Sequence, residues 1–383
     1  MVTLNSADSA LKSFYLDAVS ESLNMKINPF LAKIEKTSNY VTGKDVRKTI
    51  RVGVNGGIGA GTETGALPEA KNTRYIQMAT TLKNLYGTIE ISDKAIRASA
   101  NNEGAFVNLV NEEMQSLVKS ASNNFGRMLF GDGTGRLSMI LESDGDWVYV
   151  DNIQNFAVGM YVDIFGMPSE FQNLPVLEIN RADKCIRLNV GDATSEDLMD
   201  TEIFLHGSMG NDIIGLGAIF SEEPLYGLER EEIGMKPYIN HEFGGFTVEK
   251  LEHALDMIEE RSSYRPNFIV CSWGVRRAIT EYCRKNNVPM KDIEIEGGYK
   301  AIELLGVPVV VDKFCPEKTM YLLNTDHFKL CQLCDWQWLE AEDGKILKQV
   351  PGKPVYTATL VKYADLLCEN PAGQGKLEEI IER

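Results

Sequence analysis

Cys331 and Cys334 have the spacing in this sequence that most directly suggests chemistry, because two thiolates at this separation can bind zinc. Cys315 and His327 are close enough in the chain to complete a set of four ligands. However, the segment around the pair has the pattern of a β-strand, in which residues three positions apart point to opposite faces. The chain contains no second pair with this spacing. The sequence therefore favours small buried thiols over a metal centre.

A glycine-rich segment, residues 53–65, could cradle a phosphate with its backbone amides. It lacks the Gly-Lys-Ser/Thr ending of a P-loop, and its glycines do not have the spacing of a dinucleotide-binding fingerprint. No helical pattern follows it that would direct a helix N-terminus at the phosphate. Near the end of the chain, Gly375 and Lys376 precede Leu377, where a hydroxyl residue would be required. We therefore predict no nucleotide cofactor.

The other candidate groups do not form a catalytic or metal-binding pattern. Asp144 and Asp146 flank Gly145, but the later ligands of a calcium-binding loop are missing, so we interpret this segment as a β-turn. The Gly-x-Ser-x-Gly motif of serine hydrolases is absent, and the histidines lack the spacing of zinc proteases. The four histidines are His206, His241, His253 and His327. The sequence predicts a protein that is not an enzyme, with no catalytic, cofactor-binding or metal-binding residues.

The composition is that of an ordinary globular protein. Of 383 residues, 44% are hydrophobic and 25% are charged. No apolar run is long enough to cross a bilayer, and the N-terminus lacks the basic and apolar segments of a secretory signal. We therefore expect no membrane partner. The seven cysteines are scattered, odd in number and low in density, which indicates reduced thiols made in a cytosol.

Charge is distributed unevenly along the chain. The formal net charge is -16, yet residues 44–74 carry six cations and three anions. A basic arm on an acidic body is self-complementary between copies of one chain. A hairpin that is basic only by chance is the alternative interpretation. We predict that the following charged residues make contacts between subunits: Arg47, Arg51, Glu63, Glu69 and Arg74.

The basic segment is predicted to be a long hairpin. Residues 46–54 and 74–82 alternate between apolar and polar side chains, as strands do, and the glycine-rich loop lies between them. Loops of this length without structure of their own are uncommon in compact domains and usually have a function or are disordered. Exposed strand edges also favour pairing with another chain. The hairpin therefore predicts an assembly protein.

The remaining elements follow from periodicity. Helical spacing predicts helices over residues 8–24 and 93–99, and a long amphipathic helix over 103–130 that begins after Asn101 or Asn102. Short strands separated by turns predict a β domain, a small barrel or a sandwich, inserted at residues 140–207. A mixed α/β region follows, with helices capped by Thr247 and Ser272. Asp343-Gly344 predicts a hairpin between strands 336–342 and 345–350. A last strand, 355–363, precedes a polar tail.

Several phrases, taken in order, resemble the major capsid proteins of tailed phages with the HK97-like fold. Residues 85–92 (LYGTIEIS) and 95–99 (AIRAS) are similar to the passage from E-loop to spine helix in these proteins. Residues 125–133 (FGRMLFGDG) resemble the end of that helix. Residues 215–220 (GLGAIF) and 225–228 (LYGL) resemble the re-entry into the apical domain. The resemblance covers nearly the whole chain.

This resemblance implies an α+β fold with an N-terminal arm, an E-loop hairpin, a spine helix, and peripheral and apical domains. The inserted β domain is an addition to the minimal fold. The resemblance divides the chain into six segments. Residues 1–45 are the N-terminal arm, 46–82 the E-loop hairpin, and 83–139 the peripheral domain with the spine helix. Residues 140–207 are the inserted β domain, 208–334 the apical α/β domain, and 335–383 the return hairpin, peripheral-domain strand and C-terminal tail.

The function implied by the resemblance is self-assembly through pentamers and hexamers into an icosahedral shell. The shell would enclose phage double-stranded DNA, without sequence-specific binding, in a virion assembled in the host bacterial cytoplasm. The resemblance also implies a portal and a decoration protein as partners. A separate scaffolding protein is expected as well, since the arm before the hairpin is short. An encapsulin-like compartment that encloses a cargo enzyme is the alternative. An enzyme of a novel α/β type and a cell-surface binding module are further alternatives.

Overall fold

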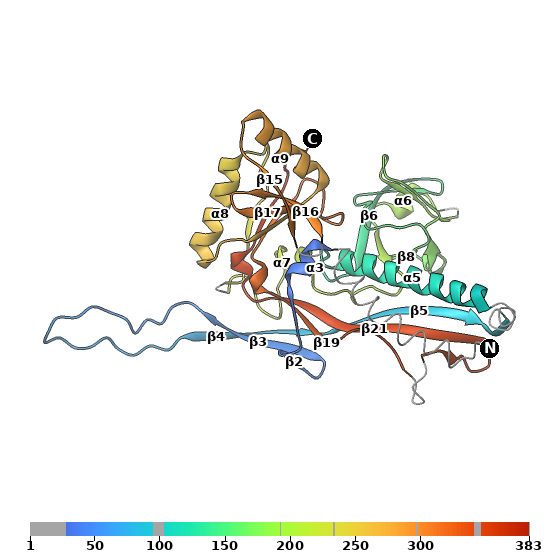
Figure 1. Ribbon diagram of the computed structural model, residues 1–383, viewed down its shortest axis with the longest axis horizontal. Coiled ribbons are helices and arrows are strands. Elements are labelled where there is room, and N and C mark those ends of the chain that lie inside the picture. The colour runs from blue at the N-terminus through green and yellow to red at the C-terminus, as the bar shows by residue number, and fades with distance from the viewer. Residues whose placement is uncertain are drawn as a thin grey trace.

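The computed structural model describes residues 28–94, 103–191, 193–232, 234–295, 298–340 and 346–382. The helix predicted over residues 8–24, most of the helix predicted over 93–99, the caps Asn101 and Asn102, and the Asp343-Gly344 turn lie outside the described residues. The described part contains four sheets and the long helix α5 (Glu103–Met128) (Figure 1). This helix confirms the one predicted over residues 103–130.

The hairpin sheet projects from the rest of the molecule (Figure 1). It contains β2 (Val41–Thr42), β3 (Asp45–Val52) and β4 (Arg74–Thr81) in that order. The two long strands are antiparallel, with a register that runs from the pair Asp45 and Thr81 to the pair Val52 and Arg74. The predicted strands over residues 46–54 and 74–82 are therefore confirmed, and residues 53–73 form the loop between them.

The long sheet lies beneath α5 in Figure 1. It consists of β1 (Glu35–Thr37), β5 (Lys83–Ser92), β19 (Phe328–Trp338), β20 (Lys348–Gln349) and β21 (Val355–Cys368). β5 pairs with one edge of β21, and the buried side chains of α5, including Met114, Val118 and Phe125, face this sheet. α3 (Pro29–Lys33) packs nearby through Phe30, whose ring meets Phe328 edge-on.

The hairpin predicted around Asp343-Gly344 is wrong as a strand pair. β19 and β20 do not pair with each other, because each pairs with β21 instead. Both strands lie along the same edge of β21. β19 lies opposite Leu360 to Cys368, and β20 lies opposite Tyr356 to Thr357. β21 is long enough to offer backbone hydrogen bonds to both, and it continues five residues past the predicted end at residue 363.

The inserted domain is a small β-barrel rather than a sandwich. Its strand order is β10-β11-β7-β6-β12-β8-β9. The two ends of this order, β9 and β10, are separated by only two residues, so the sheet curls back on itself. The first strand begins at Arg136, so the expected boundary at residue 140 cuts through it. The strands are β6 (Arg136–Asp144), β7 (Trp147–Val150), β8 (Tyr161–Ile164), β9 (Leu174–Pro175), β10 (Glu178–Asn180), β11 (Cys185–Arg187) and β12 (Glu202–Leu205).

The fourth sheet, which we call the apical sheet, carries α8 (Val248–Ser262) and α9 (Trp273–Lys285) on one face. Thr247 and Ser272 cap the two helices through their hydroxyls, as predicted. The opposite face packs into the core shared with the long sheet. The strand order is β13 (Tyr238–Asn240), β22 (Gly375–Leu377), β18 (Met320–Leu323), β14 (Phe268–Cys271), β17 (Val307–Val311), β16 (Tyr299–Leu304) and β15 (Lys291–Ile295).

The prediction of a polar tail after residue 363 is also wrong. β22 lies between β13 and β18 and pairs with both, so it is an internal strand of the apical sheet. Leu377 and Ile380 are fully buried in the core beneath α8 and α9. The segment is polar on average, yet Gln374 in it is also fully buried. Among the helices of the described residues, none combines the length and the apolar character that a membrane crossing requires.

Candidate assembly surfaces

The loop at the end of the hairpin sheet exposes apolar side chains that nothing in the same chain covers. Val54 is 91% exposed, and Ile58 and Leu67 are each 88% exposed. Figure 1 shows that this loop extends far from the body of the molecule. Large apolar groups gathered on one projecting segment are typical of a contact with another macromolecule. The hairpin is therefore the leading candidate for an assembly surface.

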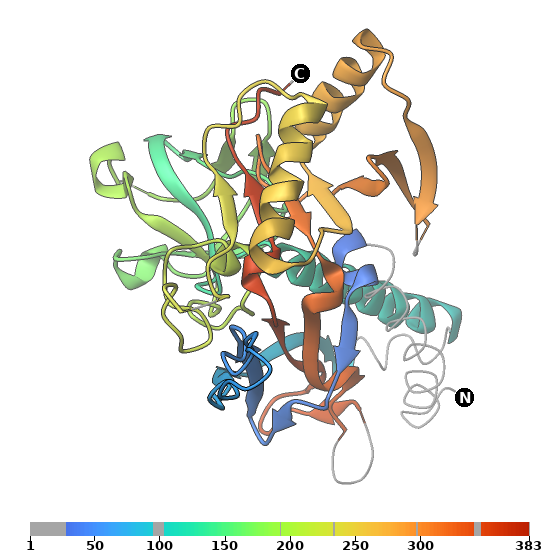
Figure 2. The same cartoon turned by 90° about the vertical axis from the view of Figure 1, so that its left-hand side faces the viewer.

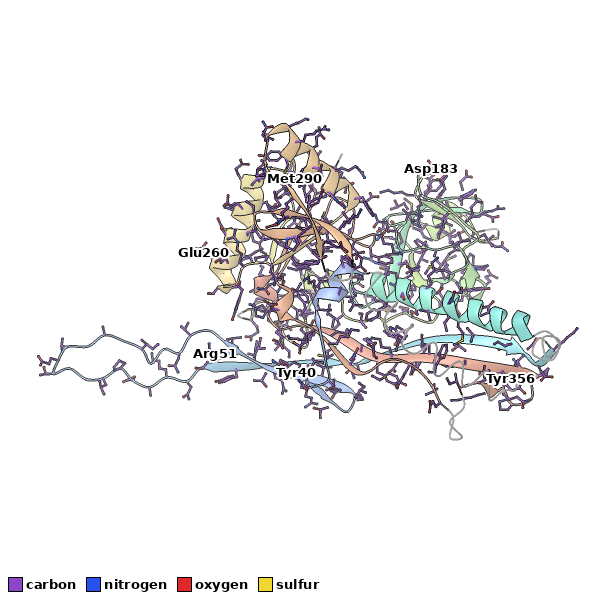
Figure 3. All side chains as sticks on the ribbon, viewed as in Figure 1. Tyr40, Arg51, Asp183, Glu260, Met290 and Tyr356 are labelled. Carbon is purple, nitrogen blue, oxygen red and sulfur yellow. The ribbon has the colours of Figure 1, made fainter. Side chains whose placement is uncertain are left out.

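The charged residues predicted to contact other subunits all lie on this hairpin, in three different settings. Arg47 is over half exposed and lies 3.2 Å from Asp45 of its own strand. Arg74 pairs within the chain with Glu232, at 2.7 Å. Figure 3 shows Arg51 on the projecting part of the hairpin, where it is exposed. The two predicted acidic contacts, Glu63 and Glu69, are exposed in the loop.

The root of the hairpin is held by a buried carboxylate that the sequence did not single out. Asp365 in β21 accepts hydrogen bonds from the hydroxyl of Thr80 at 2.6 Å and from the backbone amide of Ile214 at 2.8 Å. Its side chain is fully buried. It also accepts from the amide of Leu366, at 3.0 Å. Asp365 thus joins the hairpin, the long sheet and the chain that returns from the barrel.

Burial raises the pKa of Asp365 to about 6, although its three hydrogen bonds and the charge of Lys83 act in the opposite direction. The ordinary value for an aspartate is about 3.9. The folded protein therefore binds this proton more tightly than the unfolded chain does. The contribution of Asp365 to the free energy of unfolding is fully present below about pH 4. It decreases as the pH rises toward 6 and stays low at higher pH.

We expect Asp365→Asn to remove this pH dependence. Relative to the variant, the wild-type protein should lose about 2 kcal/mol of unfolding free energy between pH 4 and pH 7. Denaturant unfolding of both proteins at a series of pH values measures the difference. Parallel pH profiles for the two proteins would show that Asp365 is not the titrating group.

A second buried contact lies where the barrel returns to the end of α5. Arg127 in the last turn of the helix pairs with Asp212 at 2.7 Å, and both side chains are at least 97% buried. Burial raises the pKa of Asp212, and Arg127 opposes this shift. Arg127 also donates to the side-chain oxygen of Asn124 from two of its nitrogens, at 3.0 and 2.8 Å. The pair fixes the end of the helix to the returning chain.

The next residues of the returning chain lie against the carboxyl end of α5. The amide of Leu216 donates to the carbonyl of Leu129 at 2.8 Å, and the amide of Ala218 donates to Gly131 at 3.3 Å. Both carbonyls lie just beyond Met128, the last residue of α5, so these bonds hold the returning chain against the end of the helix. The approach requires glycine at position 215, because a Cβ there would lie 2.6 Å from the Gly131 oxygen and 2.8 Å from the Leu129 oxygen.

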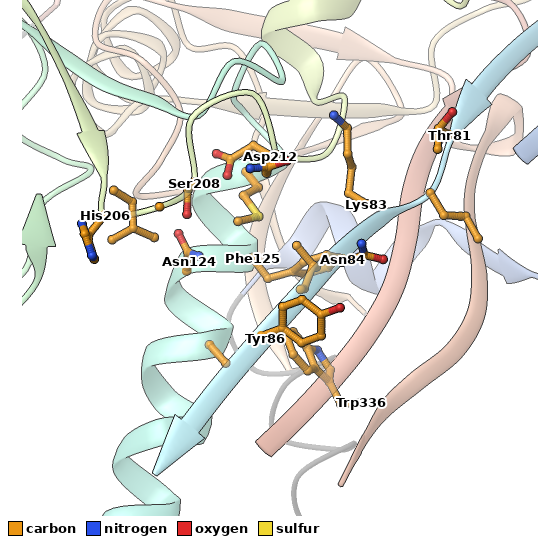
Figure 4. Close-up of a pocket in the computed structure, with 17 residues that line it drawn as sticks. Thr81, Lys83, Asn84, Tyr86, Asn124, Phe125, His206, Ser208, Asp212 and Trp336 are labelled. Atoms are coloured by element: carbon orange, nitrogen blue, oxygen red, sulfur yellow. The ribbon is translucent and has the colours of Figure 1, made fainter. Parts of the chain in front are cut away.

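A cavity of about 660 Å³ opens between β5, α5 and the chain that leaves the barrel (Figure 4). Two of its polar side chains have partners within the protein. Lys83 donates to the carbonyl of Gly210 at 2.8 Å, and His206 lies 2.7 Å from Asp163. The lining residues, all within the described ranges, include no hydrogen-bonded pair of a hydroxyl nucleophile and a base.

The cysteines of the described residues are free thiols. Cys331 is buried in the core and Cys334 is half-buried, and the strand register shifts between Gln332 and Cys334. Burial raises the pKa of the Cys331 thiol to about 12, which disfavours the thiolate that a metal requires. No group of three or more candidate metal ligands occurs among the residues that the structure describes.

Comparison with solved structures identifies the architecture. The capsid asymmetric unit of cyanophage A-1(L) aligns with a TM-score of 0.59 at 12% sequence identity, and the alignment covers 92% of each chain. The chain has the HK97-like capsid fold. In this HK97-like fold, the projecting hairpin is the E-loop and α5 is the spine helix. No protein-family model and no curated protein matches the sequence.

Two further structures align more weakly with this chain. The capsid of a native GTA particle aligns at a TM-score of 0.47 and 10% identity, over 99% of this chain and 100% of that one. The SrpI encapsulin of Synechococcus elongatus aligns at a TM-score of 0.46 and 12% identity, over 92% of this chain and 88% of that one. The fold assignment rests on the cyanophage capsid alone.

Proposed function

We propose that this protein is the major capsid protein of a tailed phage. Copies would assemble through pentamers and hexamers into an icosahedral shell that encloses double-stranded DNA. The observation that carries this proposal is the E-loop, which places Val54, Ile58 and Leu67 in solvent on a segment far from the body. A second copy of the chain would bury these side chains. In a closed symmetric assembly the same contact is repeated on every subunit, so each copy would be covered by its neighbour.

The remaining properties agree with a shell protein in a virion. Its net charge of -16 disfavours tight binding to DNA, so the packaged DNA could move against the shell. The capsid asymmetric unit of the cyanophage has the same fold. We further propose assembly in the host bacterial cytoplasm with a separate scaffolding protein and a portal, and with a decoration protein as a further partner. We propose no enzymatic activity.

Negative-stain electron microscopy of the purified protein, together with sedimentation, tests the proposal. We expect closed icosahedral particles, and nucleic acid in particles isolated from the native source. A single species of 42.7 kDa under all assembly conditions would contradict any shell function. Particles that hold a cargo enzyme and no DNA would instead support an encapsulin-like compartment.

The basic arm of the E-loop provides a more specific prediction. Changing Arg47 and Arg51 to glutamate should leave the subunit folded, because both side chains are exposed on the projecting hairpin. Particle yield should nevertheless fall at least about tenfold, since like charges that face each other across an interface cost several kcal/mol. Yield is measured by sedimentation of equal amounts of protein.

Arg136→Glu is a suitable control for this experiment. Arg136 is also an exposed arginine near an acidic residue, Glu202, but it lies on the barrel. Circular dichroism of each variant confirms that the subunit is folded. Normal particles from the Arg47 and Arg51 double variant would contradict an electrostatic role for the arm.

A further inference from the structure

The outer surface of α9 is basic and carries an exposed tryptophan. Trp273, Arg277, Thr280 and Arg284 are spaced by four, three and four residues, so they form one ridge along the helix. All four are exposed, and Trp273 is exposed by 57%. We call these four residues the α9 ridge. The helix as a whole has four cations and one anion.

The α9 ridge has the composition of a protein-protein contact. Tryptophan and arginine are the residues most enriched at the energetic centres of interfaces. The opposite side of the helix, with Val275, Ile279 and Cys283, is fully buried against the apical sheet. The ridge therefore has no role in the core of its own subunit.

The outer surface of α8 has the opposite charge. This helix carries five carboxylates and two cations. Asp256 and Glu259 pair with Arg265, at 3.2 and 2.9 Å. Glu252 and Glu260 are exposed, and neither takes part in an ion pair within the described residues. Figure 3 shows Glu260 on the flank that points away from the body.

The two helices present these charges in different directions. Both cover the same face of the apical sheet, yet α8 forms its left flank and α9 its top in Figure 1. Figure 2 shows α8 toward the viewer with α9 beyond it, at the upper right. A head-to-tail contact that closes into a ring requires two different surfaces on one subunit. α8 and α9 meet this requirement and are complementary in charge.

We infer that the α9 ridge of one subunit contacts the acidic surface of α8 on the neighbouring copy in the same ring. The inference rests on the proposed shell function and names the surfaces through which rings close. Arg277 and Arg284 face Glu252 and Glu260 of the next copy, and Trp273 supplies the apolar contact. The occupant is a second copy of the chain because the same subunit carries both the basic α9 ridge and the acidic surface of α8, which are complementary in charge.

A charge-exchange experiment on the full chain tests this contact. Arg277 and Arg284 are changed to glutamate in one variant, and Glu252 and Glu260 to arginine in a second. A third variant combines all four changes. Each double variant should reduce particle yield at least about tenfold, and the combined variant should recover most of it, because it restores complementary charge. Circular dichroism confirms folding of every variant.

Three outcomes would overturn the inference while leaving the shell function intact. The first is assembly of either double variant at wild-type particle yield. The second is a combined variant that folds but does not recover particle yield. The third is duplex-DNA binding that is lost whenever the charge of α9 is reversed, whatever the charge of α8. The last outcome would assign the ridge to nucleic acid. Absence of particles from the wild-type protein would instead contradict the shell function itself. Trp273→Ala is an independent test, since it should lower yield without changing charge.

Discussion

Replacing Arg127 with alanine should lower the free energy of unfolding by about 3–5 kcal/mol, because it leaves the buried carboxylate of Asp212 without its counter-ion. Neither side chain is more than 3% exposed, so water cannot replace the lost partner. Two hydrogen bonds to Asn124 are lost as well. Denaturant unfolding of the purified subunit at neutral pH measures the change.

Arg136→Ala provides the matched control for this prediction. Arg136 pairs with Glu202 at 3.0 Å, but both side chains are more than a third exposed. Its loss should cost about 0–1 kcal/mol. The deficit of Arg127→Ala should also shrink at acid pH, where Asp212 becomes neutral. An Arg127 variant as stable as the control would show that the buried pair does not hold the junction.

Replacing Gly215 with alanine should destabilise the protein by about 3 kcal/mol, and by more if the backbone cannot move. The new methyl group would overlap three backbone oxygens at the end of α5, those of Met128, Leu129 and Gly131. A backbone carbonyl cannot rotate away as the end of a side chain can. To remove this overlap, α7 (Leu216–Ile219) would have to move away from the end of α5. The hydrogen bond from the amide of Leu216 to the carbonyl of Leu129 would then be lost.

Gly245→Ala is the control for the glycine substitution. A methyl group there would meet nothing within 4 Å, and the backbone is not in the left-handed region. This variant should be within about 0.5 kcal/mol of the wild type. Thermal unfolding of both variants is sufficient to compare them. Equal melting temperatures would contradict a close approach at Gly215.

Both substitutions act at the place where the spine helix, the barrel and the apical sheet are connected. Arg127 and Gly215 fix the chain that returns from the barrel, and Asp365 ties the same chain to the root of the E-loop. Buried, hydrogen-bonded contacts of this kind hold one geometry rather than a range. A subunit weakened here should fold less stably and should also present its assembly surfaces less uniformly.

Local patterns in the sequence were sufficient to predict the elements that are set by residues close together in the chain. The strands of the hairpin, the helix over residues 103–130, and the caps Thr247 and Ser272 were all predicted correctly. Alternation and helical spacing are properties of consecutive residues, so they can be read without knowing the fold.

Predictions that depended on distant partners were wrong or were not made. Asp343-Gly344 suggested a local hairpin, but β21 supplies the backbone partners of both flanking strands. Residues 369–382 are polar on average, yet β22 completes the apical sheet because β13 and β18 lie on either side of it. Nothing near either segment in the sequence indicates these partners. Register and strand order are set by contacts across the fold.

Local periodicity was enough to predict a projecting glycine-rich hairpin, a long amphipathic helix and an inserted β domain. The groups that hold these parts together could be recognised only in the folded chain. Asp212 and Asp365 are two carboxylates among 55 acidic residues, and their burial follows from segments that are far apart in the chain. The charges of α8 and α9 were equally visible in the sequence, but their placement on different flanks of one sheet was not. Long-range packing sets the burial of these two carboxylates and the placement of the two helices. Local periodicity carries no information about long-range packing.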